Sequence, residues 1–175
     1  MNLPTPSPEA SAHSLTLVAA IASEIGAGGG WISFARFMEM ALYQPGLGYY
    51  SAGARKFGAA GDFVTAPEMT AYFGRALARQ VAQVIAASAP HVLEVGAGSG
   101  RLAADLLLEL ERLDALPERY EILDLSADLR ERQQVTLVAA APHLLARVRW
   151  LDRLPEAFSG AVVANELLDA MPAHV

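Results

Sequence analysis

The sequence predicts an α/β protein whose C-terminal half forms a Rossmann-like parallel sheet with helices on both faces. From residue 90 onward, short apolar segments alternate with longer segments of helical periodicity. A glycine-rich turn follows the first apolar segment, and an acidic residue ends the second one. Because parallel strands need helical crossover connections that cover the sheet, this alternation is typical of such a fold.

Each element of this half is recognised by a change of period. In chain order, the predicted elements are a strand at 91–95, a helix at 102–113, a strand at 120–124, a helix at 127–140, and strands at 148–151 and 161–164. A further helix is expected to start near Asn165. The strands are short and apolar, as buried parallel strands usually are.

The first half is predicted to be helical. The Ser-Pro pair at 7–8 is typical of a helix start, and Ser33 of a second start. Thr65 and Glu68 have the spacing of a capping box, so a third helix is expected to follow. The glycine-rich, aromatic segment 45–65 shows no period, and long segments of this kind are usually functional or disordered.

These segments divide the chain into three predicted parts. They are a flexible N-terminal tail at 1–14, a helical cap with the glycine-rich loop at 15–88, and an α/β domain with four strands at 89–175. The α/β part is expected to be incomplete, because nothing in the sequence would cover the outer edge of the strand at 161–164. An exposed apolar strand edge favours aggregation.

The composition excludes several classes of function. The chain has 53% hydrophobic and 18% charged residues, which suits a globular domain. Its net charge of −6 argues against nucleic-acid binding, and no apolar run approaches the ~18–20 residues that cross a bilayer. It has no cysteine, and its four histidines lack the spacing of metal ligands. We therefore expect a cytoplasmic protein with no nucleic-acid partner, no membrane insertion and no metal.

The turn at Gly96, Gly98 and Gly100 is the clearest ligand-binding signal. Glycines between a strand and a helix allow a tight turn and a close approach of a ligand to helix amides. The dinucleotide fingerprint would require glycine where Arg101 stands, which disfavours NAD and FAD. The pattern by itself predicts a nucleotide-type ligand bound by the three glycines.

Two carboxylates accompany this turn. Asp124 ends the second predicted strand, where an acid can accept hydrogen bonds from both ribose hydroxyls of a nucleotide. Glu94 is the penultimate residue of the first strand. Alternatively, Asp124 caps the helix that begins near Ser126, and Glu94 caps nearby backbone amides. The order of strand, turn and acid favours ribose binding for Asp124, whereas both interpretations of Glu94 stay open.

Four longer motifs extend these observations, and the two at 37–50 and 61–68 are more specific than the glycine turn, because no general folding rule requires them. They are FMEMALYQPGLGYY at 37–50, GDFVTAPE at 61–68, LEVGAGSG at 93–100 and NELLDAMP at 165–172. Through these motifs the sequence resembles the MidA family, which includes the mitochondrial protein-arginine methyltransferase that assists assembly of respiratory complex I. The resemblance implies a class I methyltransferase fold with S-adenosylmethionine (SAM) as cofactor and methyl donor.

The resemblance also implies a protein substrate, with an arginine as the methyl acceptor and a respiratory complex I subunit as the candidate partner. It covers the chain from about residue 15 to the end. Members of the family are much longer than this chain, so we expect a fragment or a truncated product.

A guanidinium acceptor needs carboxylates, because its pKa of about 12 or more keeps it protonated. A carboxylate can bind it through two hydrogen bonds and accept the departing proton. Asn165 and Glu166 follow the fourth predicted strand, and Asp62 lies in the glycine-rich segment, so these three are the predicted catalytic residues. Asp169, expected on the same helical face as Glu166, and Glu68 are weaker candidates. A first helical turn favours acids such as Glu166 and Asp169 anyway, and the capping box accounts for Glu68.

Other functions stay open at this point. A non-catalytic assembly module could keep the fold and hold a partner, or the acceptor could be a small molecule. Measurements of cofactor binding and of protein methylation would separate these possibilities. Tyr49 and Tyr50 either close on the cofactor or substrate or pack as core aromatics, and the sequence predicts no oligomeric state.

Overall fold

The structure is a computed structural model that describes residues 5–52 and 64–175. These residues form two compact units, one of 5–52 with 168–175 and one of 64–167. Among the described residues, no helix combines the length and the apolar character needed to cross a membrane.

The first unit begins with two helices, α1 (Pro8–Ala27) and α2 (Phe34–Tyr43). The hydroxyl oxygens of Ser7 and Ser33 accept hydrogen bonds from first-turn amides at 3.1 and 3.2 Å, so both serines cap their helices as predicted. Because α1 already starts at Pro8, residues 8–14 are helical although we expected them in the flexible tail. The fixed φ of a proline suits the first helical turn.

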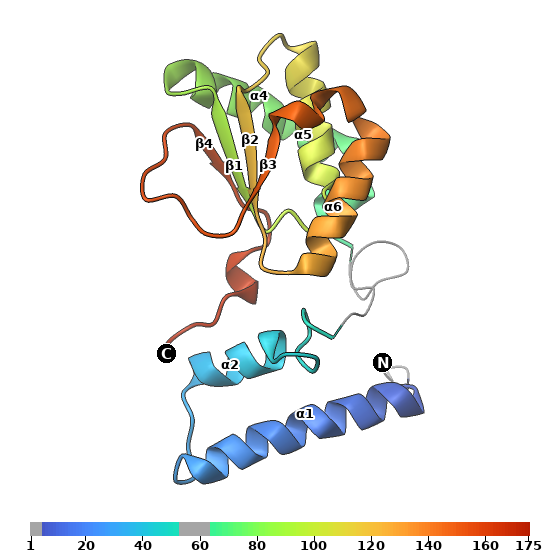
Figure 1. The fold of residues 1–175 in the computed structure, drawn as a ribbon, viewed down its shortest axis with the longest axis vertical. Helices are drawn as coiled ribbons and strands as arrows, with labels where there is room; N and C mark the ends of the chain where they lie inside the picture. Colours follow the sequence, from blue (N-terminus) through green and yellow to red (C-terminus); the bar gives the residue numbers. More distant parts are fainter. Residues whose placement is uncertain (1–4, 53–63) are drawn as a thin grey trace. The chain divides into compact units, whose positions relative to one another are not determined.

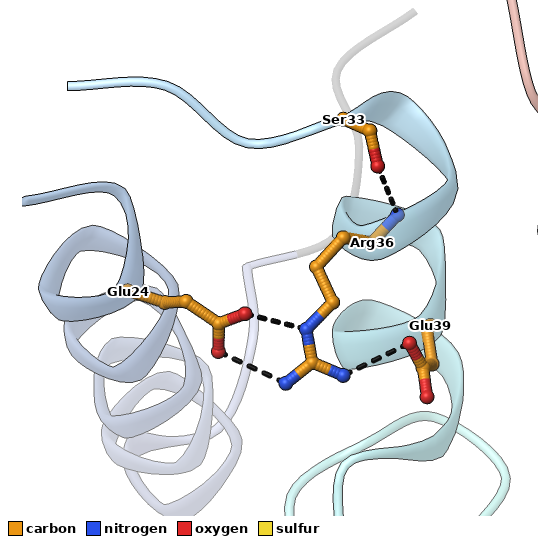
Figure 2. A network of polar contacts seen from close by, with 4 residues as sticks. All are labelled: Glu24, Ser33, Arg36 and Glu39. Carbon is orange, nitrogen blue, oxygen red and sulfur yellow. Dashed lines mark hydrogen bonds and ion pairs between the residues drawn. The ribbon is translucent and has the colours of Figure 1, made fainter. Parts of the chain in front are cut away.

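A charged network joins these two helices. Figure 2 shows Arg36 of α2 donating two hydrogen bonds to Glu24 of α1, at 2.5 and 3.0 Å, and one at 2.9 Å to Glu39. The hydrogen bond from Arg36 lowers the pKa of Glu24 below its usual range. The network lies at the surface, with 40% of the Arg36 side chain exposed, so it orients the helices more than it stabilises them.

Few apolar side chains are buried in this unit. α1 buries none of its residues, and α2 buries only Ala35 and Met40. The short 3₁₀ helix η2 (Leu168–Ala170) belongs to the same unit, and the carbonyl of its Ala170 accepts a hydrogen bond from the Tyr43 hydroxyl at 2.8 Å. The helices of this unit therefore depend on half-buried side chains and polar contacts.

The second unit contains a four-stranded parallel sheet with the strand order β3-β2-β1-β4 (Figure 1). Its elements are α3 (Ala66–Met69), α4 (Ala71–Ala87), β1 (His91–Val95), α5 (Arg101–Arg112), β2 (Arg119–Leu123), α6 (Ala127–Ala140), the 3₁₀ helix η1 (Pro142–Arg147), β3 (Val148–Leu151) and β4 (Ala161–Val163). The predicted α/β, Rossmann-like class is confirmed, and each predicted strand is found within one residue of its expected bounds.

The core of this unit lies between the helices and one face of the sheet. Strand residues at alternate positions take part in it, and the register places Val92, Tyr120 and Val148 side by side. α4, α5 and α6 all contribute to this one core, and Leu106 of α5 is completely buried. We expected helices on both faces, but in residues 64–167 the other face is more open, and Val162 of the edge strand β4 is 61% exposed.

The segment before the sheet differs from the one long helix that we expected. α3 ends at Met69, and α4 starts after Thr70, whose hydroxyl oxygen accepts a hydrogen bond from the Tyr72 amide at 3.2 Å. Thr65 precedes α3 without a side-chain cap, so the predicted capping box is wrong. The extended backbone of Thr70 interrupts the helix, and Glu68 has a different hydrogen-bond partner.

α3 and α4 group with the sheet rather than with a separate helical cap. α4 packs so closely on α5 that a Cβ at Gly74 would lie 2.6 Å from the Cβ of Asp105. The boundary between the two units therefore falls before residue 64 and not near residue 88, because the packing of α4 ties it to the sheet.

Candidate functional site

The carboxyl ends of β1, β2 and β4 meet at one edge of the sheet, which is where open parallel sheets bind ligands. Glu94 of β1 lies in register between Ile122 of β2 and Val163 of β4. From these strand ends the chain continues into the glycine turn, into Asp124 and into the segment that starts at Asn165. The sheet therefore brings together residues that the sequence places far apart.

The three glycines of the turn have positive φ angles of 71°, 55° and 82°, which L side chains rarely adopt. A Cβ at Gly96 would lie 2.8 Å from the Leu167 side chain, and one at Gly100 would lie 2.8 Å from the Cα of Gln133. A Cβ at Gly98, in contrast, would meet no atom within 4 Å. The turn is therefore tightly packed at its two ends and open in the middle, where a ligand could approach the backbone.

α5 starts directly after this turn, with Gly100 as its N-cap and no side chain capping it. The amides of a helix start favour electron-rich ligand groups. The Ser99 hydroxyl donates a hydrogen bond to Glu68 and accepts one from the Arg101 amide at 3.3 Å. Glu68 therefore belongs to the surroundings of the turn, and the sequence did not reveal this because α3 lies far from the turn along the chain.

Asp124 follows β2 and is only 8% exposed. Its Oδ1 accepts a hydrogen bond from the Ser126 amide at 3.0 Å, and its Oδ2 accepts one from the Gln133 side chain at 2.9 Å. Burial raises the pKa of Asp124, and these hydrogen bonds oppose the rise. The side chain that caps α6 is Ser126, so Asp124 is not needed for that task. The Leu125 amide is a further donor, and because a carboxylate has about four acceptor positions, Asp124 can still accept a hydrogen bond from a ribose hydroxyl.

Glu94 lies in β1, two residues before the glycine turn, and is 2% exposed. Its Oε2 accepts a hydrogen bond from the Tyr120 hydroxyl at 2.6 Å. Burial raises the pKa of Glu94 to about 7, the hydrogen bond from Tyr120 opposes this, and the charge of Asp124 adds to it. Glu94 can therefore gain or lose a proton near neutral pH, and sequence reasoning missed its partner Tyr120, which lies on a neighbouring strand.

Gln133 of α6 is a further site residue that the sequence did not reveal. It is completely buried, and its Nε2 donates hydrogen bonds to the Gly98 carbonyl at 3.1 Å and to Asp124 at 2.9 Å. Its Oε1 accepts a hydrogen bond from the indole Nε1 of Trp150 at 2.9 Å. Gln133 is one of two successive glutamines in a largely polar helix, so no local pattern distinguishes it.

Asn165 and Glu166 follow β4, but the helix that we expected there is absent. Glu166 has a φ of 50°, a left-handed conformation that is uncommon for residues other than glycine. Helical structure begins only with η2, so the prediction that Glu166 and Asp169 share a helical face is wrong. The segment after β4 is not helical because the side chain of Leu167 packs against Gly96, and this contact holds the segment against the glycine turn.

Two of the predicted site residues remain, Asp62 and Asp169. Asp62 lies outside the described residues. Asp169 belongs to the first unit, where burial and the charge of this carboxylate raise the pKa of Tyr50. The ring of Tyr50 lies 5.0 Å from that of Tyr49 and 5.5 Å from that of Tyr43, as measured between centroids. These tyrosines thus form an aromatic cluster within the first unit.

Two solved structures are similar to the chain over 98% of its length. One is a crystal structure of a "likely methyl transferase" from Burkholderia thailandensis bound to S-adenosyl-homocysteine, with 55% identity and a TM-score of 0.91. The other is a native crystal structure of an uncharacterized protein from the same bacterium, with 53% identity and a TM-score of 0.85. The chain covers 46% and 44% of these two proteins.

A family model described as "Putative S-adenosyl-L-methionine-dependent methyltransferase" matches residues 76–175, which is more than half of the chain. The fold, the glycine turn and this match define the class as SAM-dependent methyltransferases. Within that class, the chain belongs to the MidA family, as the resemblance implied, and the cofactor of this family is SAM.

Curated relatives of the family are more distant. The chain is 27% identical to the mitochondrial "Protein arginine methyltransferase NDUFAF7 homolog" of Caenorhabditis elegans and 30% identical to the mitochondrial "Protein arginine methyltransferase NDUFAF7" of Bos taurus. Both alignments cover 83% of this chain but only 39% and 38% of the relatives. The chain therefore spans about two fifths of the length of these proteins.

Proposed function

We propose that the protein uses SAM to methylate the guanidinium group of an arginine in a protein substrate. One observation carries this proposal: a buried acid, an open glycine backbone and an exposed acid in a rare conformation lie along one edge of the sheet. They are Asp124, Gly98 and Glu166. The arginine acceptor is supported by the names of the relatives, which are protein arginine methyltransferases.

In this proposal Asp124 accepts hydrogen bonds from the ribose hydroxyls of SAM, and the backbone at Gly96, Gly98 and Gly100 contacts the rest of the cofactor. The residues fit such a group. The carboxylate of Asp124 is held by protein donors and can still accept a further hydrogen bond, and the open side of Gly98 leaves its backbone accessible. Glu94, buried close to Asp124, adds negative charge in its ionised form, which favours the positively charged groups of SAM.

When bound, SAM supplies a methyl group on a positively charged sulfur. The protein's own task is then to hold the acceptor and remove a proton. Glu166 binds the guanidinium through two hydrogen bonds and accepts the proton that the nitrogen loses as it gains the methyl group. Asn165 offers both a donor and an acceptor that orient the acceptor. Because strained backbone positions are common at functional sites, the φ of Glu166 supports this assignment.

Two measurements test the proposal in sequence. Calorimetric titration with S-adenosyl-homocysteine (SAH) is expected to show binding of one molecule per chain, and its absence would contradict the cofactor part. Incubation with SAM that carries an isotope-labelled methyl group, first with respiratory complex I subunits and then with other proteins, is expected to label arginine. Label only on another residue type or on small molecules would contradict the acceptor, and no label would favour a non-catalytic module.

A variant of the acid after β4 separates acceptor binding from cofactor binding. Glu166→Gln is expected to lose methyl transfer by two orders of magnitude or more (~10²-fold, the usual effect of a general base) while its affinity for SAH stays within about twofold. Glu156→Gln, a change in another exposed acid before β4, is the matched control and is expected to be fully active. An equal loss of SAH affinity in Glu166→Gln would assign Glu166 to the cofactor site.

A further inference from the structure

We propose that Gln133 is a positioning residue for the cofactor, which joins the glycine turn to Asp124 through a side-chain amide whose orientation Trp150 fixes. The inference rests on the proposed function, because it requires Asp124 to bind the ribose of SAM. It goes beyond that function by assigning a role to two residues, on α6 and β3, that lie outside the motifs of the turn.

The orientation of the Gln133 amide follows from its partners. The indole Nε1 of Trp150 can only donate a hydrogen bond, so the atom that it meets at 2.9 Å must be the amide oxygen of Gln133. The amide nitrogen then faces the Gly98 carbonyl at 3.1 Å and Asp124 Oδ2 at 2.9 Å, which are both acceptors. All donors and acceptors of this amide pair correctly in this orientation, and a flipped amide would oppose like groups.

The hydrogen bonds of this amide act on both parts of the proposed cofactor site. Toward Asp124 it occupies one lone pair of Oδ2, while the Ser126 amide holds Oδ1, so the plane of the carboxylate is set from two sides. Toward the turn it holds the carbonyl of Gly98, the residue whose backbone is open to a ligand. A single buried side chain thus links the loop after β1 to the end of β2.

The backbone of α6 reinforces this link. The Cα of Gln133 lies so close to Gly100 that a Cβ there would approach it to 2.8 Å, so the helix rests directly on the turn. Gln133 is completely buried at this contact, whereas the next residue, Gln134, is exposed. The two neighbouring glutamines therefore offer an internal comparison, in which the same chemical change meets two different environments.

The experiment compares Gln133→Glu with Gln134→Glu by calorimetric titration of SAH. Glutamate at 133 keeps the shape and can still accept from Trp150, but it offers no amide donors and adds a negative charge beside Asp124. We expect Gln133→Glu to weaken SAH binding by about tenfold or more, the effect of losing hydrogen bonds to a charged group. Gln134→Glu carries the same charge change and is expected to stay within about twofold of the wild type.

A second readout tests the route through the ribose. The affinity of the wild type for SAH is expected to exceed that for its 2′,3′-dideoxy analogue, and in Gln133→Glu this ratio should fall by about fivefold or more because Asp124 is no longer held in place. A merely destabilised protein would lose affinity for both ligands equally and keep the ratio. Trp150→Phe removes the indole donor together with part of the ring that packs on the core, and we expect it to lower the same ratio by a smaller factor, of about two to five.

The outcomes separate this inference from the proposed function. Failure of the wild type to bind SAH would overturn both. Binding by the wild type together with an unchanged ratio in Gln133→Glu would overturn the role of Gln133 alone. If Gln133→Glu does not fold, as judged by its thermal melting, Trp150→Phe decides, and an unchanged ratio in that variant would likewise overturn the inference.

Discussion

The sheet unit and the N-terminal helical unit bury apolar surface to very different extents. α5 of the sheet unit buries most of its apolar side chains, and Leu106 and Leu110 are completely inaccessible to solvent. α1 is longer but buries no residue, and its Leu15 and Val18 are 69% and 56% exposed. Because apolar burial is the main stabilising term of folded proteins, the sheet unit should set the cooperative stability of this chain.

The polar networks of the two units differ in the same way. The amide of Gln133 is fully buried and meets three partners, so losing any of them leaves an unsatisfied group inside the protein. Arg36 in the first unit also meets two partners, but water can replace them. Burial therefore makes the polar contacts of Gln133 obligatory and fixes its orientation, whereas the exposed contacts of Arg36 can be exchanged for water.

The largest effect is expected from a cavity in the sheet unit. Leu106→Ala removes a fully buried side chain and should lower the free energy of unfolding by about 2–5 kcal/mol. Leu15→Ala, the same change on the exposed side of α1, should alter it by less than about 0.5 kcal/mol. Urea unfolding followed by circular dichroism measures both values. Similar losses in the two variants would contradict the proposed difference between the units.

The next effect concerns two glycines with nearly the same φ. Gly100→Ala combines the left-handed conformation with a clash against the backbone of α6, and we expect it to cost about 3 kcal/mol and to abolish SAH binding. Gly29→Ala in the first unit meets nothing within 4 Å, so only the conformational term of about 1 kcal/mol remains. Thermal melting and titration with SAH provide the measurements. Equal effects would show that the contact with Gln133 is unimportant.

A smaller effect is expected from pH in the ligand-free protein. The pKa of Glu94 is about 7 in the folded state and near 4.5 in the unfolded state, so the folded state binds more protons between these pH values. Stability is therefore fully present below about pH 4.5 and is lost as pH rises through 7, by at most about 3 kcal/mol. Urea midpoints at pH 5 and pH 8 check this prediction.

Glu94→Gln is the matched variant for this dependence. It cannot ionise, so the fall in stability between pH 5 and pH 8 should become shallower. Burial also raises the pKa of Asp124, so this residue acts on stability in the same direction. An unchanged slope in Glu94→Gln would assign the effect to other groups.

The smallest effect is expected at the surface network of the first unit. Arg36→Leu removes the contacts with Glu24 and Glu39 that Figure 2 shows, and amide hydrogen exchange in α1 and α2 should accelerate by no more than about fivefold. Exchange in α5 serves as the internal reference and should not change. A collapse of protection throughout α1 would show that the network stabilises this unit more than its exposure indicates.

Most of the fold could be predicted from the sequence because its signals are local. The serine at 33 and the alternation of apolar strands with helices follow from short-range chemistry, and the structure matches them closely. The capping box at Thr65 failed because its Glu68 meets Ser99, a partner that is remote in sequence. The prediction of a helix near Asn165 was wrong because the packing of Leu167 against Gly96 overrides a local pattern, acidic and leucine-rich, that suits a helix.

In the candidate site, too, residues with a local sequence pattern were predicted and residues defined by remote contacts were not. Glycines and acids at strand ends carry their own pattern, so the turn and Asp124 could be singled out in advance. Gln133 and Tyr120 could not be singled out in advance. A glutamine in a polar helix and a tyrosine in a strand acquire these hydrogen bonds only through the packing of α6 and the register of the sheet. Supporting residues of this kind are the part of a site that local sequence patterns do not show.

The hydrogen bond from Trp150 to Gln133 also couples a natural fluorophore to the candidate site. The chain has two tryptophans, and Trp31 lies in the other unit with 72% of its surface exposed. In a Trp31→Phe variant, tryptophan fluorescence would come from Trp150 alone. Its indole donates a hydrogen bond to Gln133, which in turn donates one to Asp124. A ligand that engages Asp124 should then shift the emission spectrum without any added label, which would allow cofactor analogues to be screened by fluorescence.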